Sequence, residues 1–535
     1  MGYLGIYDII GIQSYIFNTS KLKEIIGASV LVENALKELL IASIKEVIKE
    51  EECRVTDWSY REDFVLPKNN NILAEVIYIG GGNAIVAYRN KDIMKEVNKD
   101  FSKKLFENTY SLKFAFAQIE TDFENFSNDY KRLNIEKEKF KYSSNKTRAG
   151  LNYSISMQDI DTGMPIIGKY NSEYLTMEKK LKRDEELKSR IKKQQNMDSD
   201  FIIPDEFEYM ISEKYQNSYI AIVHIDGNNM GKRIEEIISK KEDYSEAVKY
   251  IRIISSSIEE IYQKAFNDMV KSIEDKLSDN DFLKKNGIKL TEVDGKKYHV
   301  IRDIILNGDD VTYVINGKLA LDSAAIFISN IESNSFPLTD KPMSCCAGVA
   351  LMHSHYTFSN AYGIAEQCCS LAKRKAKVEA LLHQKDVKSY IDFHICSGAI
   401  TSLENYRKDN YMFPGKEPEE RGTGSLRYYS YSFLERPWLV TGESNELDWE
   451  CFKKMYVDLL YKNDNNKPWP RSRLKELQSK FHLGQEEVKE YLFECKSRGY
   501  ILPGVDIEST DYDRKLAAYY DVIELMDHFA LIEEV

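Results

Sequence analysis

The fold is decided by residues 219–231, YIAIVHIDGNNMG, and residues 301–316, IRDIILNGDDVTYVIN. The first stretch is a continuous apolar run that ends at Asp226, which is typical of a buried strand. In the second stretch, Asn307-Gly308 separates two apolar runs and predicts a hairpin, because both residues tolerate positive φ. Asp309 and Asp310 follow at once, where the return strand begins. Three carboxylates therefore stand at strand ends that can lie side by side.

These three carboxylates have the chemistry of a divalent-metal site. Neighbouring strands lie ~4.7–4.9 Å apart, so Asp226 can converge with Asp309 and Asp310. Oxygen ligands alone favour Mg²⁺ or Mn²⁺ over zinc. Two such ions can activate an attacking hydroxyl and steady the leaving oxygen in phosphoryl transfer. Each aspartate alone is an ordinary turn residue, but the combination predicts catalytic carboxylates and metal ligands, with Ile225 as a further candidate ligand.

Residues suited to phosphate binding surround the carboxylates. Gly227 and Asn228 come just before a predicted helix, where backbone N–H groups can approach a phosphate closely. Gly308 stands in the hairpin turn itself. Lys373, near the end of a later predicted helix, can reach a triphosphate. The alternative for Lys373 is a solvated helix end whose cations complement the helix dipole.

The chain is predicted to be α+β, with two ferredoxin-like palm domains in tandem. The order strand, helix, hairpin, helix, strand, helix occurs twice, which indicates an internal duplication. Residues 179–194 form a charged run that predicts a solvated, helical part of the connector. The predicted domains are a first, degenerate palm at 1–150, a helical connector at 151–215, a second, catalytic palm at 216–400 and a mainly helical C-terminal domain at 401–535.

The first palm lacks the carboxylate pair. In its predicted hairpin, Gly82 stands where the second palm has Asp309, and Asn83 stands where it has Asp310. Asp8 alone cannot assemble a metal site. Gly81 and Gly82 are suited to close backbone contact, so this palm is expected to bind or frame a nucleotide, or to stabilise the pair of palms.

Composition restricts the classes of function. The 535 residues carry a formal net charge of −12, which argues against a general nucleic-acid binder with a basic surface. No apolar run approaches the ~18–20 residues of a membrane helix. The eight cysteines form no C-x-x-C motif, so buried free thiols in a reducing cytoplasm are expected. The sequence leaves an oligomer possible.

Five short motifs together resemble a known family. They are residues 8–17 (DIIGIQSYIF), 80–83 (GGGN), 224–231 (HIDGNNMG), 307–310 (NGDD) and 346–350 (CAGVA). They look like the two-palm large subunit of type III CRISPR effector complexes, whose core is similar to GGDEF cyclases and polymerase palms. The likeness spreads over about residues 1–400, and a helical C-terminal domain is also expected of the family.

The resemblance implies a function. It implies ATP or another nucleoside triphosphate as substrate, Mg²⁺ or Mn²⁺ as cofactor, and cyclic oligoadenylates as antiviral second messengers. RNA or other defence proteins are the implied activators. By motif, Asp226, Asp309 and Asp310 correspond to metal ligands and Lys373 to a triphosphate contact. The nucleotides are expected to lie between the two palms.

The sequence also departs from the family pattern. The usual Gly-Gly-Asp-Asp reads Asn307-Gly308-Asp309-Asp310, and Asn still permits the turn, so activity is expected to survive. The N-terminal nuclease domain of many relatives and the cysteine zinc motif of the connector are expected to be missing, which allows a stand-alone relative in another defence system. Two other functions remain open: a cyclic dinucleotide synthase that uses GTP, and a non-catalytic RNA- or nucleotide-binding scaffold.

Overall fold

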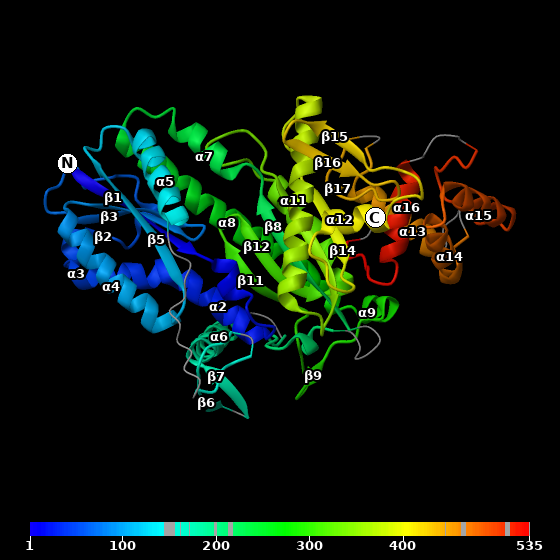
Figure 1. Cartoon of the computed structure of the whole chain (residues 1–535), viewed down its shortest axis with the longest axis horizontal. Coiled ribbons are helices and arrows are strands. Elements are labelled where there is room, and N and C mark those ends of the chain that lie inside the picture. The colour runs from blue at the N-terminus through cyan, green and yellow to red at the C-terminus, as the bar shows by residue number, and fades with distance from the viewer. Residues whose placement is uncertain are drawn as a thin grey trace.

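The computed structural model describes residues 1–143, 156–160, 162–170, 172–196, 201–211, 218–443, 446–461, 467–508 and 514–533. Figure 1 shows two mixed α/β halves side by side, with a group of helices beyond the second half. Each half contains an antiparallel core sheet of the ferredoxin-like order, so the predicted α+β fold with two palms is confirmed. None of the helices in the described part of the chain is both long and apolar enough to cross a membrane.

The first palm has a five-stranded sheet in the order β2-β3-β4-β1-β5. Its first strand in the chain, β1 (Gly2–Ile10), pairs antiparallel with β4 and β5 and is buried, as its apolar sequence predicts. The strands are β1 (Gly2–Ile10), β2 (Cys53–Arg54), β3 (Ala74–Gly80), β4 (Asn83–Tyr88) and β5 (Lys113–Thr121). The helices are α1 (Ile12–Ile16), α2 (Leu22–Asn34), α3 (Ile41–Val47), α4 (Lys91–Thr109) and α5 (Phe126–Ser143), with a π-helical turn at Ala35–Leu40.

The second palm has a six-stranded sheet in the order β11-β12-β8-β13-β14-β17. The strands are β8 (Tyr219–Gly227), β11 (Ile301–Asn307), β12 (Asp310–Asn316), β13 (Cys345–His353), β14 (Tyr390–Ile395) and β17 (Trp438–Leu439). The helices are α7 (Met230–Ile238), α8 (Tyr244–Leu277), α9 (Asn280–Asn286), α10 (Ala320–Glu332) and α11 (Phe358–His383). A small hairpin, β9 (Glu292–Val293) and β10 (Lys296–Lys297), precedes β11.

The two palms match in register as well as in order. Asp8 of β1 lies opposite Asn83 of β4, and Asp226 of β8 lies opposite Asp310 of β12. Both hairpins carry a register shift at the same place, three residues before the turn: between Val76 and Tyr78 in β3, and between Asp303 and Ile305 in β11. A β-bulge increases local twist, so both hairpins are bent alike toward their tips.

The connector helix α6 (Met177–Asn196) corrects one expectation. It was predicted to be solvated, but one of its faces is buried against α2. Lys182 is 1% exposed, and its ammonium donates to Glu178 at 2.7 Å and to the carbonyl of Tyr15 at 2.7 Å. Because buried charges are satisfied in pairs, a charged sequence here hides a buried face. The hairpin of β6 (Ile166–Tyr170) and β7 (Glu173–Thr176) precedes α6.

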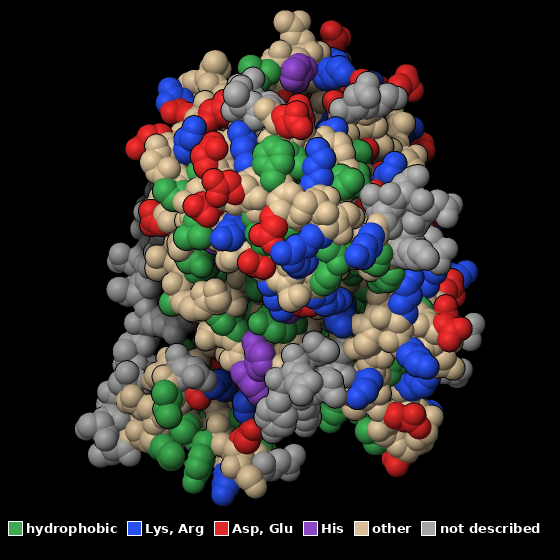
Figure 2. Space-filling view, turned by 90° about the vertical axis from the view of Figure 1, so that its right-hand side faces the viewer, with side chains coloured by type: hydrophobic (Ala, Val, Ile, Leu, Met, Phe, Trp, Pro, Cys, Tyr) green, Lys and Arg blue, Asp and Glu red, His purple; other side chains and the backbone are tan. Residues whose placement is uncertain are grey.

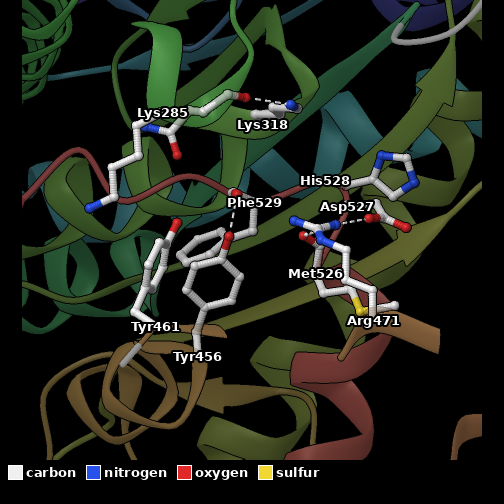
Figure 3. A pocket seen from close by; sticks show the side chains of 10 residues that line it. Lys285, Lys318, Tyr456, Tyr461, Arg471, Met526, Asp527, His528 and Phe529 are labelled. Atoms are coloured by element: carbon white, nitrogen blue, oxygen red, sulfur yellow. Dashed lines mark hydrogen bonds and ion pairs between the residues drawn. The ribbon is translucent and has the colours of Figure 1, made fainter. Parts of the chain in front are cut away.

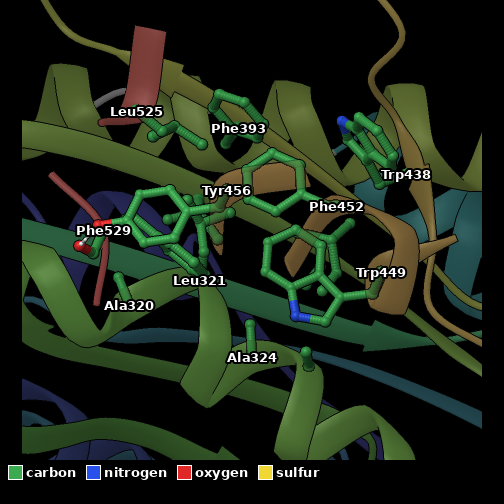
Figure 4. Close-up of a cluster of buried hydrophobic side chains, with 14 of the residues drawn as sticks. Ala320, Leu321, Ala324, Phe393, Trp438, Trp449, Phe452, Tyr456, Leu525 and Phe529 are labelled. Atoms are coloured by element: carbon green, nitrogen blue, oxygen red, sulfur yellow. Dashed lines mark hydrogen bonds between the residues drawn. The ribbon is translucent and has the colours of Figure 1, made fainter. Parts of the chain in front are cut away.

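The C-terminal residues share a core with the second palm. Aromatic side chains of α13, together with Trp438 of β17 and Phe529, pack on Phe393 and on α10, as Figure 4 shows. The strand β17 therefore belongs to the palm sheet, although it falls within the predicted C-terminal range. The elements here are α12 (Leu403–Asn410), β15 (Glu419–Thr423), β16 (Leu426–Ser430), α13 (Trp449–Leu460), α14 (Arg471–Phe481), α15 (Gln485–Ser497) and α16 (Arg514–Leu525).

Helix α8 joins the two palms. Arg252 in this helix is 1% exposed and donates to the Glu75 carboxylate of β3 at 3.2 Å and to the Val76 carbonyl at 2.6 Å. The same helix packs on α10 of the second palm. The expectation of buried, free cysteines is confirmed for every cysteine except Cys451, which is partly exposed.

Candidate active site

The three predicted carboxylates come together at one end of the second palm sheet. Asp226 lies opposite Asp310 across two adjacent antiparallel strands. Asp309 occupies the two-residue turn between Asn307 and Asp310, next to Gly308, whose φ is +62°. The turn conformation favours glycine at this position, because an L side chain there meets the backbone. The Asn-Gly pair in the sequence thus sets the hairpin that brings the aspartates to Asp226.

Gly227 is required by the close approach of Asp309. A Cβ atom added at Gly227 would lie 2.9 Å from Oδ2 of Asp309 and 2.6 Å from Cε of Met230. Gly227 is also buried, and its strand position is fixed by pairing with Cys345. The glycine that follows Asp226 therefore makes room for the second carboxylate.

The negative charge of the three carboxylates is only partly neutralised by neighbouring groups. Burial, and then the charge of Asp226, raise the pKa of Asp309 to about 6. Burial, Asp226 and Asp309 together raise the pKa of Asp310 to about 7. The side chains of Asp226 and Asp310 are 40% and 45% exposed, but Oδ1 of Asp310 is itself buried without a hydrogen-bond partner, so the cluster is half-buried with one side open to solvent. A half-buried cluster of mutually repelling carboxylates is suited to a cation.

Lys373 of α11 supplies one cation. Its ammonium forms an ion pair with Asp226 and donates to the Gly227 carbonyl at 3.0 Å. Burial lowers the pKa of Lys373, but Asp226 together with the neighbouring Cys369 and Cys346 more than offsets burial, and the pKa is raised. Of the two alternatives for Lys373, the structure therefore supports a place in the site over a purely solvated helix end.

His224 of β8 also adjoins the site. Its Nδ1 lies 3.0 Å from Oγ1 of Thr312 and 3.5 Å from Oδ1 of Asp310. Burial lowers the pKa of His224, so a neutral ring is favoured. Residues i and i+2 of a strand share a face, so the spacing of His224 and Asp226 was the available signal.

The first palm meets the second at the two hairpin tips. A Cβ atom added at Gly308 would lie 3.9 Å from the backbone nitrogen of Gly81. Gly81 and Gly82 have φ values of +58° and +75°, so the glycine-rich turn is as predicted. Next to the tips, Gln13 of α1 donates to the Tyr362 hydroxyl at 3.2 Å and to another α11 side chain, Glu366, at 3.0 Å.

Sequence reasoning did not identify Gln13 or Tyr362. The ring of Tyr362 stacks on Phe17 at 3.9 Å between centroids and faces His224 at 5.7 Å. These contacts depend on how the two palms dock, and no local pattern carries that information.

Two other candidate residues lie deeper. Asn228 is 1% exposed, and its amide donates to Oγ of Ser344 at 3.2 Å and to the Lys388 carbonyl at 3.4 Å. Its side chain is thus directed into the protein, which leaves only its backbone for a ligand. Ile225 is fully buried within the strand ladder, opposite Val311. Any role of Ile225 as a ligand would fall to its backbone.

The donor set fits a divalent metal in chemistry. The three carboxylates offer only oxygen, and the raised pKa values of Asp309 and Asp310 indicate that a positive charge would be stabilised there. Lys373 supplies part of this charge at Asp226. Among the described residues, no group of three or more His, Cys, Asp or Glu side chains is already arranged to hold a metal ion. Metal binding would therefore require the carboxylates to close further and Lys373 to move.

Comparisons with known proteins agree with this architecture. Residues 219–382 match the family model for the second palm domain of Cas10/Cmr2, so the predicted resemblance is confirmed. A solved Csm1–Csm4 cassette in complex with cA3 is similar, with a TM-score of 0.51 and 11% identity over 99% of this chain and 70% of that chain. A Csm1–Csm4 subcomplex of the type III-A CRISPR–Csm interference complex matches at a TM-score of 0.48 and 12% identity, covering 98% and 70%. No curated protein matches the sequence.

Proposed function

We propose that this chain, whose second palm is of the Cas10/Cmr2 kind, is a metal-dependent nucleotidyl cyclase that makes cyclic oligoadenylates from ATP. The observation that carries the proposal is the pairing of Asp226 with Asp310, with Asp309 in the adjoining turn and Lys373 on Asp226. This arrangement concentrates carboxylates and one lysine at an exposed sheet end, as phosphoryl transfer to a hydroxyl requires.

The reaction joins one nucleotide to the next. The 3′-hydroxyl of one ATP attacks the α-phosphorus of another, the bond to pyrophosphate breaks, and the hydroxyl proton passes to solvent; a last such step closes the ring. Divalent metal would supply charge neutralisation at the reacting phosphate, held by Asp226, Asp309 and Asp310. Lys373, released from Asp226, would contact the triphosphate. Most of the rate would come from positioning and electrostatics.

The first palm would hold the second nucleotide. Its hairpin tip of Gly81 and Gly82 faces Gly308 and offers backbone without side chains. Similar Csm1–Csm4 cassettes have been solved with cA3, with cA4 and with one ATP, which supports adenosine as the base. Those cassettes pair the similar chain with a second protein, which supports other defence proteins as activators of this chain. RNA is the other proposed activator.

A non-catalytic nucleotide-binding scaffold is the second candidate. The ion pair between Lys373 and Asp226 favours it, because it neutralises one of the three carboxylates and leaves no ready metal cluster among the described residues. The two candidates differ in whether pyrophosphate is released.

The test incubates the purified protein with ATP, GTP, CTP or UTP and with Mg²⁺ or Mn²⁺, alone and with added RNA. Products are separated and identified by mass spectrometry. The proposal predicts a cyclic oligoadenylate from ATP that disappears in an Asp309→Ala/Asp310→Ala variant. An Asp92→Ala variant, which removes a side chain that is 90% exposed at the start of α4, beyond the end of β4 that lies away from the hairpin tip, is expected to keep the product.

The outcomes separate the candidates. A product from GTP alone would replace adenosine by guanosine and retain the chemistry. Metal-dependent nucleotide binding without any product, with and without RNA, would favour the scaffold. Absence of both product and metal-dependent binding would reject the cyclase.

A further inference from the structure

A cavity lies where the C-terminal residues meet the second palm. It has a volume of about 340 Å³ and is lined from α9, from the turn after β12, from α13 and α14, and from the segment that follows α16. Figure 3 shows Lys285 and Lys318 on one side of the cavity and Tyr456, Tyr461 and Arg471 on the other. The proposed catalytic residues do not line it.

Positive charge dominates this cavity. Lys285, Lys318 and Arg471 line it, whereas Asp527 is the single acidic residue in its lining. Lys475 also reaches Asp527, at 3.0 Å, so two cations share that carboxylate. The chain as a whole carries a net charge of −12, so this local excess runs against the overall balance.

Lys318 is the most confined of the cations. It is partly buried, and its ammonium donates to the Asn286 carbonyl at 2.5 Å. Burial, and then the charge of Arg471, lower the pKa of Lys318, and Asp527 offsets this only in part. Two cations that repel each other beside one cavity gain free energy when an anion enters between them.

The walls of the cavity are firmly built. The Tyr456 hydroxyl donates to the Phe529 carbonyl at 2.9 Å, and the backbone nitrogen of Ala530 donates to the Lys318 carbonyl at 2.8 Å. The Lys285 ammonium makes a cation–π contact with Tyr461, 4.6 Å from the ring centroid. The wall formed by Tyr456 and the backbone of Lys318 are therefore held in place before a ligand binds, which reduces the entropy lost on binding.

We propose that this cavity binds a small phosphorylated anion of pyrophosphate to mononucleotide size. Its volume is at the lower end of ligand pockets, which are typically ~300–1,000 Å³. On the face of the molecule in Figure 2, basic and acidic side chains are interspersed, which does not suit a long nucleic-acid strand. The observations thus favour a compact anion in a local basic cavity over an RNA.

The site is separate from the palm carboxylates. Asp226 and Asp310 stand at one end of β8 and β12, whereas Lys318 follows the other end of β12. About six residues of strand at ~3.3 Å each separate the two ends by roughly 20 Å. The two strands connect the sites through a rigid sheet, so an anion bound at Lys318 would not occupy the catalytic site.

The test measures binding by calorimetry to the full chain carrying Lys373→Met, in EDTA, so that the palm site is weakened. The probes are inorganic pyrophosphate, adenosine 5′-monophosphate and a single-stranded RNA. We expect one saturable site for pyrophosphate or the monophosphate, and the stronger probe identifies the source of the phosphate. Lys318→Met and Arg471→Met should each weaken binding by about tenfold, because each removes a charged hydrogen-bond donor.

The control removes equal charge elsewhere. Lys496 of α15 and Arg498, which directly follows that helix, lie outside the cavity with side chains 49% and 54% exposed, so Lys496→Met and Arg498→Met should each leave binding unchanged. Circular dichroism confirms that each variant is folded, and the exposed Arg471 provides a test if Lys318→Met is not. The proposal is overturned if neither small anion binds, if the control weakens binding equally, or if only the RNA binds.

Discussion

At the scale of single residues, Lys373 connects the acidic site to its proposed substrate. It pairs with Asp226 and is carried by α11. Lys373→Met keeps the length of the side chain and removes the charge. We expect product formation from ATP to fall about 10²–10³-fold, as on loss of one electrostatic contact in a transition state. Initial rates of pyrophosphate release measure this.

The matched control for Lys373 is one helical turn away. Lys377 lies on the same face of α11 and is only partly buried. The structure records no contact between Lys377 and the site carboxylates. Lys377→Met should change the rate by no more than about twofold, as for a surface charge. Equal losses in both variants would indicate a general effect of charge and not a contact at the site.

The repulsion among the carboxylates predicts a pH-dependent stability. The pKa of Asp309 is about 6, above its usual value of 3.8, so the folded state is penalised where Asp309 is ionised. The penalty is complete above about pH 6 and absent below about pH 4. Asp309→Asn should therefore raise the melting temperature of the metal-free protein by about 1 °C at pH 8, given a solvent-reduced gain of about 1 kcal/mol in a chain of 535 residues.

Calorimetric scans at pH 4.5 and pH 8 in EDTA check this sign. The gain in melting temperature should be smaller at pH 4.5, because Asp309 is then protonated in the folded protein and its unfolded carboxyl, with a pKa of 3.8, is already partly protonated. A gain that is the same at both pH values would mean that the substitution acts through packing and not through charge.

The sequence was sufficient to predict the three aspartates of the site but not the side chains that surround them. Asp226, Asp309 and Asp310 were predictable because a strand end and a hairpin turn are local patterns. The contacts of Gln13 with Tyr362 were not predictable, since they join residues 349 positions apart across the palm interface. The burial of Asn228 under Ser344 likewise depends on β13, which lies more than a hundred residues later.

At the scale of elements, the β11–β12 hairpin positions two of the three carboxylates. Gly308 has φ +62° and lies close to Gly81 of the opposite hairpin. Gly308→Val should strain the turn and cost about 1–2 kcal/mol, because a β-branched side chain adopts this conformation poorly. The displaced tip should reduce product formation by more than tenfold. Gly363→Ala, in the open interior of α11, should instead stabilise by about 0.5–1 kcal/mol.

The connector helix provides an independent prediction about stability. Lys182 and Glu178 form an ion pair with both side chains no more than 2% exposed. Lys182→Met would leave the Glu178 carboxylate buried without its main cation, which costs about 3–5 kcal/mol. Lys180→Met, on the exposed side of the same helix, should leave the urea midpoint nearly unchanged, because a solvent-exposed ion pair contributes little to stability. Urea unfolding, followed by circular dichroism, distinguishes the two.

The existence and order of the elements were predictable, but the environment of α6 was not. Runs of alternating charge usually mark solvated helices, and residues 179–194 fit that pattern. The buried face exists because Glu24 and Tyr15 of the first palm offer partners for Arg183 and Lys182. Such partners become visible only when α2 is seen to pack on α6.

At the scale of the whole molecule, the chain is a duplicated palm in which only the second palm carries all three carboxylates. The two hairpins agree in register and in the place of their bulges, yet only the second carries Asp309 and Asp310, where the first has Gly82 and Asn83. Under the proposed function, the second palm would carry out the chemistry and the first would place a nucleotide. Both glycine-bearing turns meet where the two palms face each other.

One measurement tests this asymmetry most directly. Radiolabelled ATP is incubated with Mn²⁺ and with whichever activator supports the wild type, and cyclic products are quantified for Asp226→Asn and for the matched Asp8→Asn of the first palm. The account predicts that Asp226→Asn loses product by about 10³-fold or more, whereas Asp8→Asn keeps it within about tenfold. Equal loss in both variants, or product that persists without Asp226, would contradict it.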